Sequence, residues 1–202
     1  MNEKVRKLVT MAMLAALSIV LVYVIHFPIF PAASFLEYDP ADIPILIGTF
    51  AYGPLAGVLL TVVVSGMTVS SGSGLMGIAM HIFATSILVL VAGNIYRVKH
   101  TKKGAVLALV CGVLAMTAGM VVFNYFITPY FITPDLADTA AVAANREFVK
   151  TLLVPVIVPF NLIKAGVNSV VTFLVYKTVS RHLVHGENWK KEPGVKQAQP
   201  EQ

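Results

Sequence analysis

Residues 43–69, with the sequence IPILIGTFAYGPLAGVLLTVVVSGMTV, decide the fold because they are uncharged and contain a single Gly-Pro pair. Proline in a helix interior removes a hydrogen bond and clashes with the preceding turn, whereas proline in a first turn is tolerated. A Gly-Pro pair in mid-stretch therefore ends one helix and allows another to begin. The stretch predicts two consecutive helices, over residues 43–52 and 54–69, which meet at Gly53 and Pro54.

The rest of the chain is similarly apolar, since 57% of its 202 residues are hydrophobic and only 12% are charged. A soluble domain of this length cannot cover so much apolar surface in one core, so lipid must be part of its solvent. Further apolar stretches cover residues 8–25, 75–96, 104–126 and 151–176, each close to the ~20 residues that a spanning helix needs. Helices are the expected spanning structure because they satisfy their own backbone groups in lipid.

The basic residues decide the number of spans. They cluster at residues 4–7, 97–103 and 177–196, and the positive-inside rule places such clusters in the cytoplasm. Five spans would put residues 97–103 outside, whereas six put both termini and 12 of the 15 Lys and Arg residues inside. We therefore expect an all-α integral membrane protein with six transmembrane helices and both termini cytoplasmic. The approximate spans are residues 8–26, 43–52, 54–69, 75–97, 104–127 and 151–181.

These helices are expected to form one membrane domain over residues 1–185, followed by a disordered polar tail over residues 186–202. Residues 27–42 and 128–150 are long outer loops, the second with a short helix at residues 135–148. The first apolar run exceeds the ~7–15 residues of a signal-peptide core, so it is expected to be retained. The charge pattern is explained by membrane topology, and no nucleic-acid partner is expected.

Lys164 is the most informative residue, because a charge inside a span costs roughly 2.5–3.5 kcal/mol and usually faces a bundle interior or a wet cavity. Asn161, Lys164, Asn168 and Thr172 follow 3-4-4 spacing, which places them on one helix face. Asn161 and Lys164 suit a ligand site, while the lower two suit packing. The alternative for Lys164 is that its stem reaches the lipid surface.

Asn124 and His81 are further candidates for the wall of an outward-facing pocket. Asn124 lies near the outer end of its span and can face Asn161, because the two helices are consecutive and antiparallel. Hydrogen bonding between helices is the alternative role for Asn124. His81 has no metal-ligand partner at helical spacing, so a buried packing role is its alternative.

The first outer loop and the first helix supply the remaining candidates. Tyr38 and Asp42 combine aromatic surface with hydrogen-bond acceptors and are candidates to cover a planar ligand, with loop anchoring as the alternative. Ala12, Ala15 and Ala16 lie near the cytoplasmic end of the first helix. Their small side chains permit close approach of a helix, within the bundle or from a partner subunit.

The sequence lacks the residues that several kinds of chemistry require. The sequence has no phosphate-binding G-x-x-x-x-G-K-[ST] loop, so energy for transport is expected to come from another protein. The single Cys111 lies in a span, which leaves no disulfide and no cysteine-based metal site. The acidic residues lie outside the expected spans, so a proton relay through the bundle lacks carriers. We expect neither an enzyme nor a bound metal or cofactor.

Four segments carry a resemblance to a known family: LEYDPADIP at 36–44, FAYGPLAG at 50–57, NYF at 124–126 and VPFNLIK at 158–164. Over roughly residues 5–183 the chain resembles the substrate-binding subunits of energy-coupling factor (ECF) vitamin transporters, in particular the riboflavin-binding type. The resemblance implies six helices and riboflavin held near the outer surface, with Asn124, Asn161 and Lys164 at ligand-contacting positions.

The resemblance also implies partners and a location. It makes the alanine pattern of the first helix a docking surface for a transmembrane coupling subunit, which joins two ATPases in a prokaryotic plasma membrane. Because lysine also binds phosphate, flavin mononucleotide (FMN) or another vitamin is an alternative ligand. A membrane enzyme acting on a lipid headgroup, with Asp39 and Asp42 as its acids, is the alternative of a different class. An accessory subunit that only docks onto a partner is a third.

Overall fold

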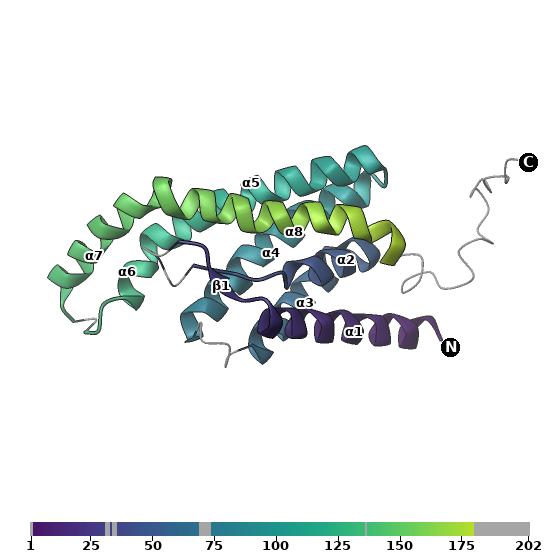
Figure 1. Cartoon of the computed structure of the whole chain (residues 1–202), viewed down its shortest axis with the longest axis horizontal. Helices are drawn as coiled ribbons and strands as arrows, with labels where there is room; N and C mark the ends of the chain where they lie inside the picture. The colour runs from purple at the N-terminus through teal and green to yellow at the C-terminus, as the bar shows by residue number, and fades with distance from the viewer. Residues whose placement is uncertain (1, 31–32, 34–35, 69–73, 136, 180–202) are drawn as a thin grey trace, which may run out of the picture.

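The computed structural model describes residues 2–30, 33, 36–68, 74–135 and 137–179, and these form a helical bundle (Figure 1). Two-residue strands β1 (Phe27–Pro28) and β2 (Glu37–Tyr38) follow the first helix. The helices are α1 (Glu3–Val24), α2 (Asp42–Tyr52), α3 (Pro54–Met67), α4 (Gly74–Val98), α5 (Lys102–Phe126), α6 (Thr128–Phe131), α7 (Thr139–Leu152) and α8 (Val158–Val179). The polar tail expected at residues 186–202 lies outside the described residues.

Helices α2 and α3 meet at Gly53, which is where the Gly-Pro pair predicts the break. Gly53 has φ 95° and ψ 170°, a conformation that residues with a Cβ rarely adopt, and Pro54 begins α3. Among the described residues, four helical segments are long and apolar enough to cross a membrane: Glu3–Val24, Leu75–Val98, Lys102–Phe126 and Thr139–Tyr176. Helices α2 and α3 are shorter, with 11 and 14 residues.

The last span differs from its expected form. In place of a helix over residues 135–148 and a separate span from residue 151, α7 continues into α8 through the π-helical turn Leu153–Ile157. Pro155 and Pro159 lack the N–H groups that regular α-helical hydrogen bonds require, and a wider turn accommodates the missing donors. The outer loop before it also contains the short helix α6.

Residues 27–42, which the sequence predicts only as a loop, contain a small hairpin. Strands β1 and β2 pair in antiparallel register, with Phe27 opposite Tyr38 and Pro28 opposite Glu37. The hairpin returns the chain to the start of α2, which packs beside α8 although the two are far apart in sequence (Figure 1). Residues near 37–42 thereby meet the interior face of α8.

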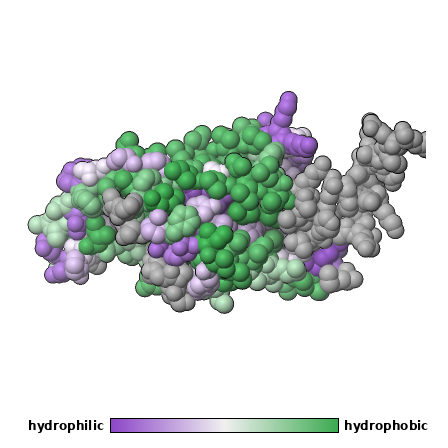
Figure 2. All heavy atoms as spheres, viewed as in Figure 1, coloured by the Kyte–Doolittle hydropathy of each residue, from purple (hydrophilic) through white to green (hydrophobic). Residues whose placement is uncertain are grey.

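The surface and the arrangement of the helix ends both fit a membrane environment. Figure 2 shows mostly apolar side chains over the middle of the molecule, around a smaller hydrophilic patch, and further hydrophilic side chains toward its two ends. Large apolar side chains are exposed on the surface, including Val24 at 73% and Leu55 at 79%. The start of α1 and the end of α8 lie at the same end of the bundle (Figure 1).

Candidate functional site

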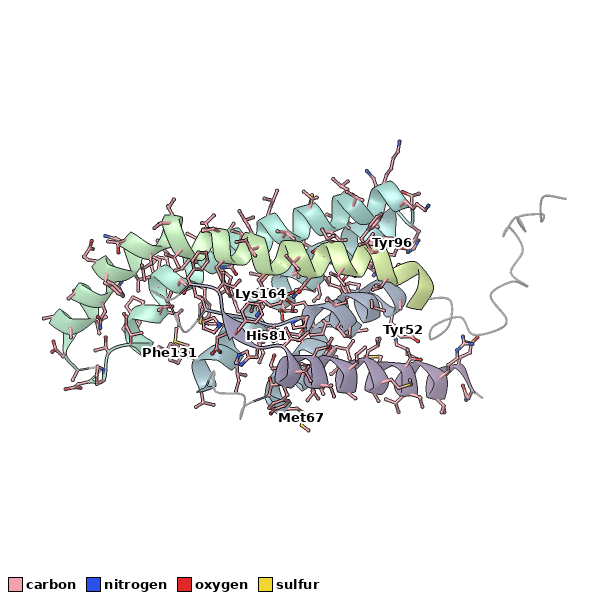
Figure 3. The ribbon with its side chains drawn as sticks, viewed as in Figure 1. Tyr52, Met67, His81, Tyr96, Phe131 and Lys164 are labelled. Carbon is pink, nitrogen blue, oxygen red and sulfur yellow. The ribbon has the colours of Figure 1, made fainter. Side chains whose placement is uncertain are left out.

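A hollow of about 760 Å³, counted together with the open solvent at its mouth, lies between α1, the β2 strand, α3, α4, α5 and α8. Met80, Met116, Met120, Phe160 and other apolar side chains form much of its wall. Its polar lining is His26, Glu37, Asp39, Ser65, Thr68, His81, Asn161 and Lys164. Figure 3 shows Lys164 and His81 within the bundle, between Phe131 at one end and Tyr52 and Tyr96 at the other. The mixture of apolar wall and convergent polar groups is typical of a small-molecule site.

Lys164 faces this hollow and is only 8% exposed, which excludes the alternative that its stem reaches the lipid surface. Its position in an apolar helix suggests an ammonium isolated among apolar neighbours, but the structure gives this ammonium polar partners. Lys164 Nζ lies 2.7 Å from Asp39 Oδ2 and donates a second hydrogen bond to the Glu37 carbonyl at 3.3 Å. The ion pair offsets the desolvation of the lysine, which otherwise makes a buried charge unfavourable.

Asp39 is held rigidly against α8. Its Oδ1 accepts a hydrogen bond from the Ala41 backbone N–H at 3.0 Å, and its carbonyl accepts one from Asn168 Nδ2 at 3.1 Å. An aspartate that bonds the backbone two residues ahead stabilises a local turn. This turn fixes the carboxylate beside Lys164, so the partner of the buried lysine is supplied by the first outer loop.

Asp42 is the first residue of α2 and is fully buried, whereas the sequence placed it just outside the span expected from residue 43. Its carboxylate accepts hydrogen bonds from Thr85 at 2.7 Å and from Asn168 at 3.2 Å. His81 Nε2 lies 3.3 Å from Asp42 Oδ1. Asp42 does not line the hollow, so the structure places it behind the wall, where it holds α2, α4 and α8 together.

His81 lines the hollow and also belongs to a hydrogen-bonded chain. Ser65 Oγ lies 2.7 Å from His81 Nδ1 and 2.7 Å from the Thr61 carbonyl. The other ring nitrogen, Nε2, faces the Asp42 carboxylate, so the imidazole connects α3 to the start of α2. Ser65 lies in a part of α3 that is otherwise Val-rich, and its proximity to His81 is a feature that sequence spacing does not reveal.

Tyr38 ties the hairpin to α8 and does not line the hollow. Its hydroxyl donates to Asn168 Oδ1 at 3.0 Å, and its ring packs against Phe27. Burial, with the nearby Asp39 and Asp42 carboxylates, raises the pKa of the Tyr38 hydroxyl above its ordinary value. The hydroxyl therefore remains protonated near neutral pH and can donate this bond.

The two candidate asparagines separate. Asn161 lines the hollow, and its Nδ2 donates to the Ile157 carbonyl at 2.8 Å. Asn124 is fully buried outside the hollow, where it donates to the Met120 carbonyl and accepts from Thr128 Oγ1 at 3.0 Å. The structure thus places Asn124 outside the wall, bonded to its own helix and to the start of α6, and Asn161 and Lys164 in the wall.

The hairpin adds His26 and Glu37, which sequence reasoning missed. His26 Nε2 lies 2.8 Å from a Glu37 carboxylate oxygen at the edge of the hollow. The alanines of α1 differ in burial: Ala12 and Ala16 are exposed, whereas Ala15 is buried in the bundle. Among the described residues, no group of three or more His, Cys, Asp or Glu side chains could hold a metal ion.

Comparison with known proteins identifies the family. The sequence model of the substrate-specific component of ECF transporters matches residues 6–176. The chain is 32% identical to a riboflavin transporter RibU of Staphylococcus aureus (strain TCH60) over 88% of this chain and 92% of that protein. It is 29% identical to the riboflavin transporter FmnP of Bacillus subtilis (strain 168), over 86% and 91% of the two chains.

A solved structure of the S component of a bacterial ECF transporter has the same fold. It superposes with a TM-score of 0.71 at 29% identity and covers 88% of this chain and 96% of that one. Membership in a transporter family, together with this structural similarity, excludes the lipid-headgroup enzyme as an interpretation. The chain belongs to the family of substrate-specific components of ECF transporters.

Proposed function

We propose that this chain is the riboflavin-binding S component of an ECF importer, and that it captures the vitamin from the outer face of a prokaryotic plasma membrane. The observation that carries the proposal is the hollow between α1, α3, α4, α5 and α8, in which Asn161 and Lys164 meet an apolar wall. Its relatives in Staphylococcus aureus and Bacillus subtilis are named as riboflavin transporters. FMN and other vitamins are the alternative ligands.

The chemistry of riboflavin suits this hollow. Its ring system is flat and largely apolar, and its ribityl chain offers neutral hydroxyl groups. Methionine and aromatic side chains such as Met116, Met120 and Phe160 can cover the rings, since sulfur and aromatic groups adapt to planar surfaces. Asn161 and Lys164 can then bond the hydroxyls or the ring acceptors. Tyr38, Asp42 and Asn124 support these groups from behind, and His81 shares the wall.

The proposal includes partners that supply energy. Because the sequence lacks a phosphate-binding loop, two ATPase subunits and a transmembrane coupling subunit are proposed to drive uptake. The exposed Ala12 and Ala16 lie four residues apart on α1 and would let a helix of the coupling subunit approach closely. Ala15 faces the bundle and is assigned to internal packing.

Titration of the purified chain with riboflavin, followed by quenching of flavin fluorescence, tests the ligand. Lys164→Ala and Asn161→Ala should each weaken binding by roughly 1–3 kcal/mol, because each removes a buried polar contact. Lys150→Ala is the matched control, since Lys150 pairs with Glu147 on the exposed face of α7, away from the hollow. Competition with FMN and other vitamins identifies the preferred ligand.

Two results would argue against riboflavin. One is the absence of saturable binding by the wild-type chain. The other is binding that Lys164→Ala, Asn161→Ala and Lys150→Ala all leave unchanged, since the ligand would then occupy another surface. Thermal unfolding of each variant separates loss of contact from loss of fold, because Lys164→Ala also leaves Asp39 without its partner.

A further inference from the structure

The charged groups around the hollow do not favour an anion. Three carboxylates, one ammonium and two imidazoles line it or stand directly behind its wall: Glu37, Asp39, Asp42, Lys164, His26 and His81. With both imidazoles neutral, the carboxylates exceed the ammonium by two charges. With both protonated, the charges balance. Among the described residues, no protonation state of the two histidines makes this region positive.

Most of the N–H donors of Lys164 are also already bonded within the protein. An ammonium has three N–H donors, and Lys164 directs two of them to Asp39 Oδ2 and the Glu37 carbonyl. One donor remains for a ligand. Asp39 cannot easily withdraw, because its other carboxylate oxygen and its carbonyl are bonded to Ala41 and Asn168.

On the basis of the proposed function, we infer that Asp39 determines specificity by neutralising Lys164, so that the site selects uncharged flavins over phosphorylated ones. Riboflavin ends in a neutral polyol, and one N–H donor is sufficient for a hydroxyl or a ring carbonyl. A phosphate monoester such as FMN carries a charge of about −1.5 to −2 at neutral pH. This charge is repelled by Asp39 and the neighbouring carboxylates.

The experiment compares two ligands on three proteins. The wild-type full-length chain, Asp39→Asn and Glu147→Gln are purified and titrated with riboflavin and with FMN, following flavin fluorescence. Glu147→Gln is the matched control because it removes the same charge from an exposed ion pair on α7. The measured quantity is the ratio of the FMN Kd to the riboflavin Kd.

The wild-type chain is expected to bind FMN about tenfold more weakly than riboflavin, or worse, because the hollow does not compensate the phosphate charge. Asp39→Asn should lower the Kd ratio by about tenfold, since removing one nearby negative charge favours the charged ligand over the neutral one. Glu147→Gln should leave the ratio unchanged.

The outcomes separate the inference from the proposed function. Absence of riboflavin binding by the wild-type chain overturns the proposed function and the inference together. Riboflavin binding with an unaltered ratio in Asp39→Asn overturns the inference alone. A wild-type chain that binds FMN as tightly as riboflavin also overturns the inference alone, and this outcome can be measured even if Asp39→Asn fails to fold.

Discussion

Asn168 is the residue on which the outer half of the structure depends. The sequence assigns it to packing on α8, yet its amide joins three separate groups. Its Oδ1 accepts from the Tyr38 hydroxyl, and its Nδ2 donates to the Asp39 carbonyl and to the Asp42 carboxylate. These three bonds are 3.0, 3.1 and 3.2 Å long, and Asn168 is fully buried. One side chain therefore connects the hairpin, the start of α2 and the wall of the hollow.

Asn168→Ala should destabilise the protein strongly, because it leaves a hydroxyl, a carbonyl and a carboxylate without their buried partner. Each unsatisfied group costs about 1–3 kcal/mol and each kcal/mol lowers the midpoint of a chain of this length by about 2–4 °C, so we expect the midpoint of thermal unfolding to fall by at least about 6 °C. Asn94→Ala is the control, because Asn94 is exposed and bonds only the Leu90 carbonyl of its own helix. Equal midpoints for the two variants would contradict the central role of Asn168.

At the scale of elements, two helix irregularities position the site. The break at Gly53 lets α2 and α3 follow different paths, so that α2 packs beside α8 while α3 packs beside α4. The π-helical turn Leu153–Ile157 carries α7 into α8 and precedes Asn161 by one turn. Both irregularities occur at prolines, where the regular helical hydrogen bonds cannot form. They allow the helices to surround a hollow in which polar groups meet an apolar wall.

Gly53→Ala should destabilise the protein, because φ 95° brings a Cβ into conflict with its own backbone at a cost of about 1–2 kcal/mol. Gly66→Ala is the matched control within α3. A Cβ at Gly66 meets nothing within 4 Å, and its φ is not positive, so alanine should be neutral or slightly stabilising there. Thermal unfolding of both variants checks the comparison. A Gly53→Ala protein as stable as Gly66→Ala would show that the break does not require a left-handed residue.

The whole molecule has features that agree with six spans and cytoplasmic termini, which we propose. Apolar side chains cover most of its middle, around a smaller hydrophilic patch, and further hydrophilic side chains lie toward its ends (Figure 2). The start of α1 and the end of α8 share one end, while α6 and α7 occupy the other (Figure 1). An even number of crossings produces this arrangement. The basic residues between α4 and α5 are then cytoplasmic, as the positive-inside rule expects.

Cysteine labelling in intact cells tests this orientation. In a Cys111→Ala background, Ala144→Cys on exposed α7 should react with a membrane-impermeant maleimide added outside. Lys103→Cys, at the start of α5, should react only after the cells are permeabilised. The reverse pattern would invert the topology and place the hollow on the cytoplasmic side. Equal reactivity of both sites in intact cells would exclude the proposed crossing between them.

The sequence by itself determined the membrane character and the helix break at Gly53, and it singled out Lys164 and Asn161, which line the hollow. These follow from local properties, namely apolar length, the backbone limits of proline and the position of a charge along one helix. Only the tertiary structure decided that Lys164 pairs with Asp39, 125 residues away, and that Ser65 meets His81. The structure also places Asn124, Asp42 and Tyr38 outside the wall of the hollow. Sequence could not decide these contacts, because a buried charge requires a partner but which partner reaches it depends on how the hairpin and α2 return to α8.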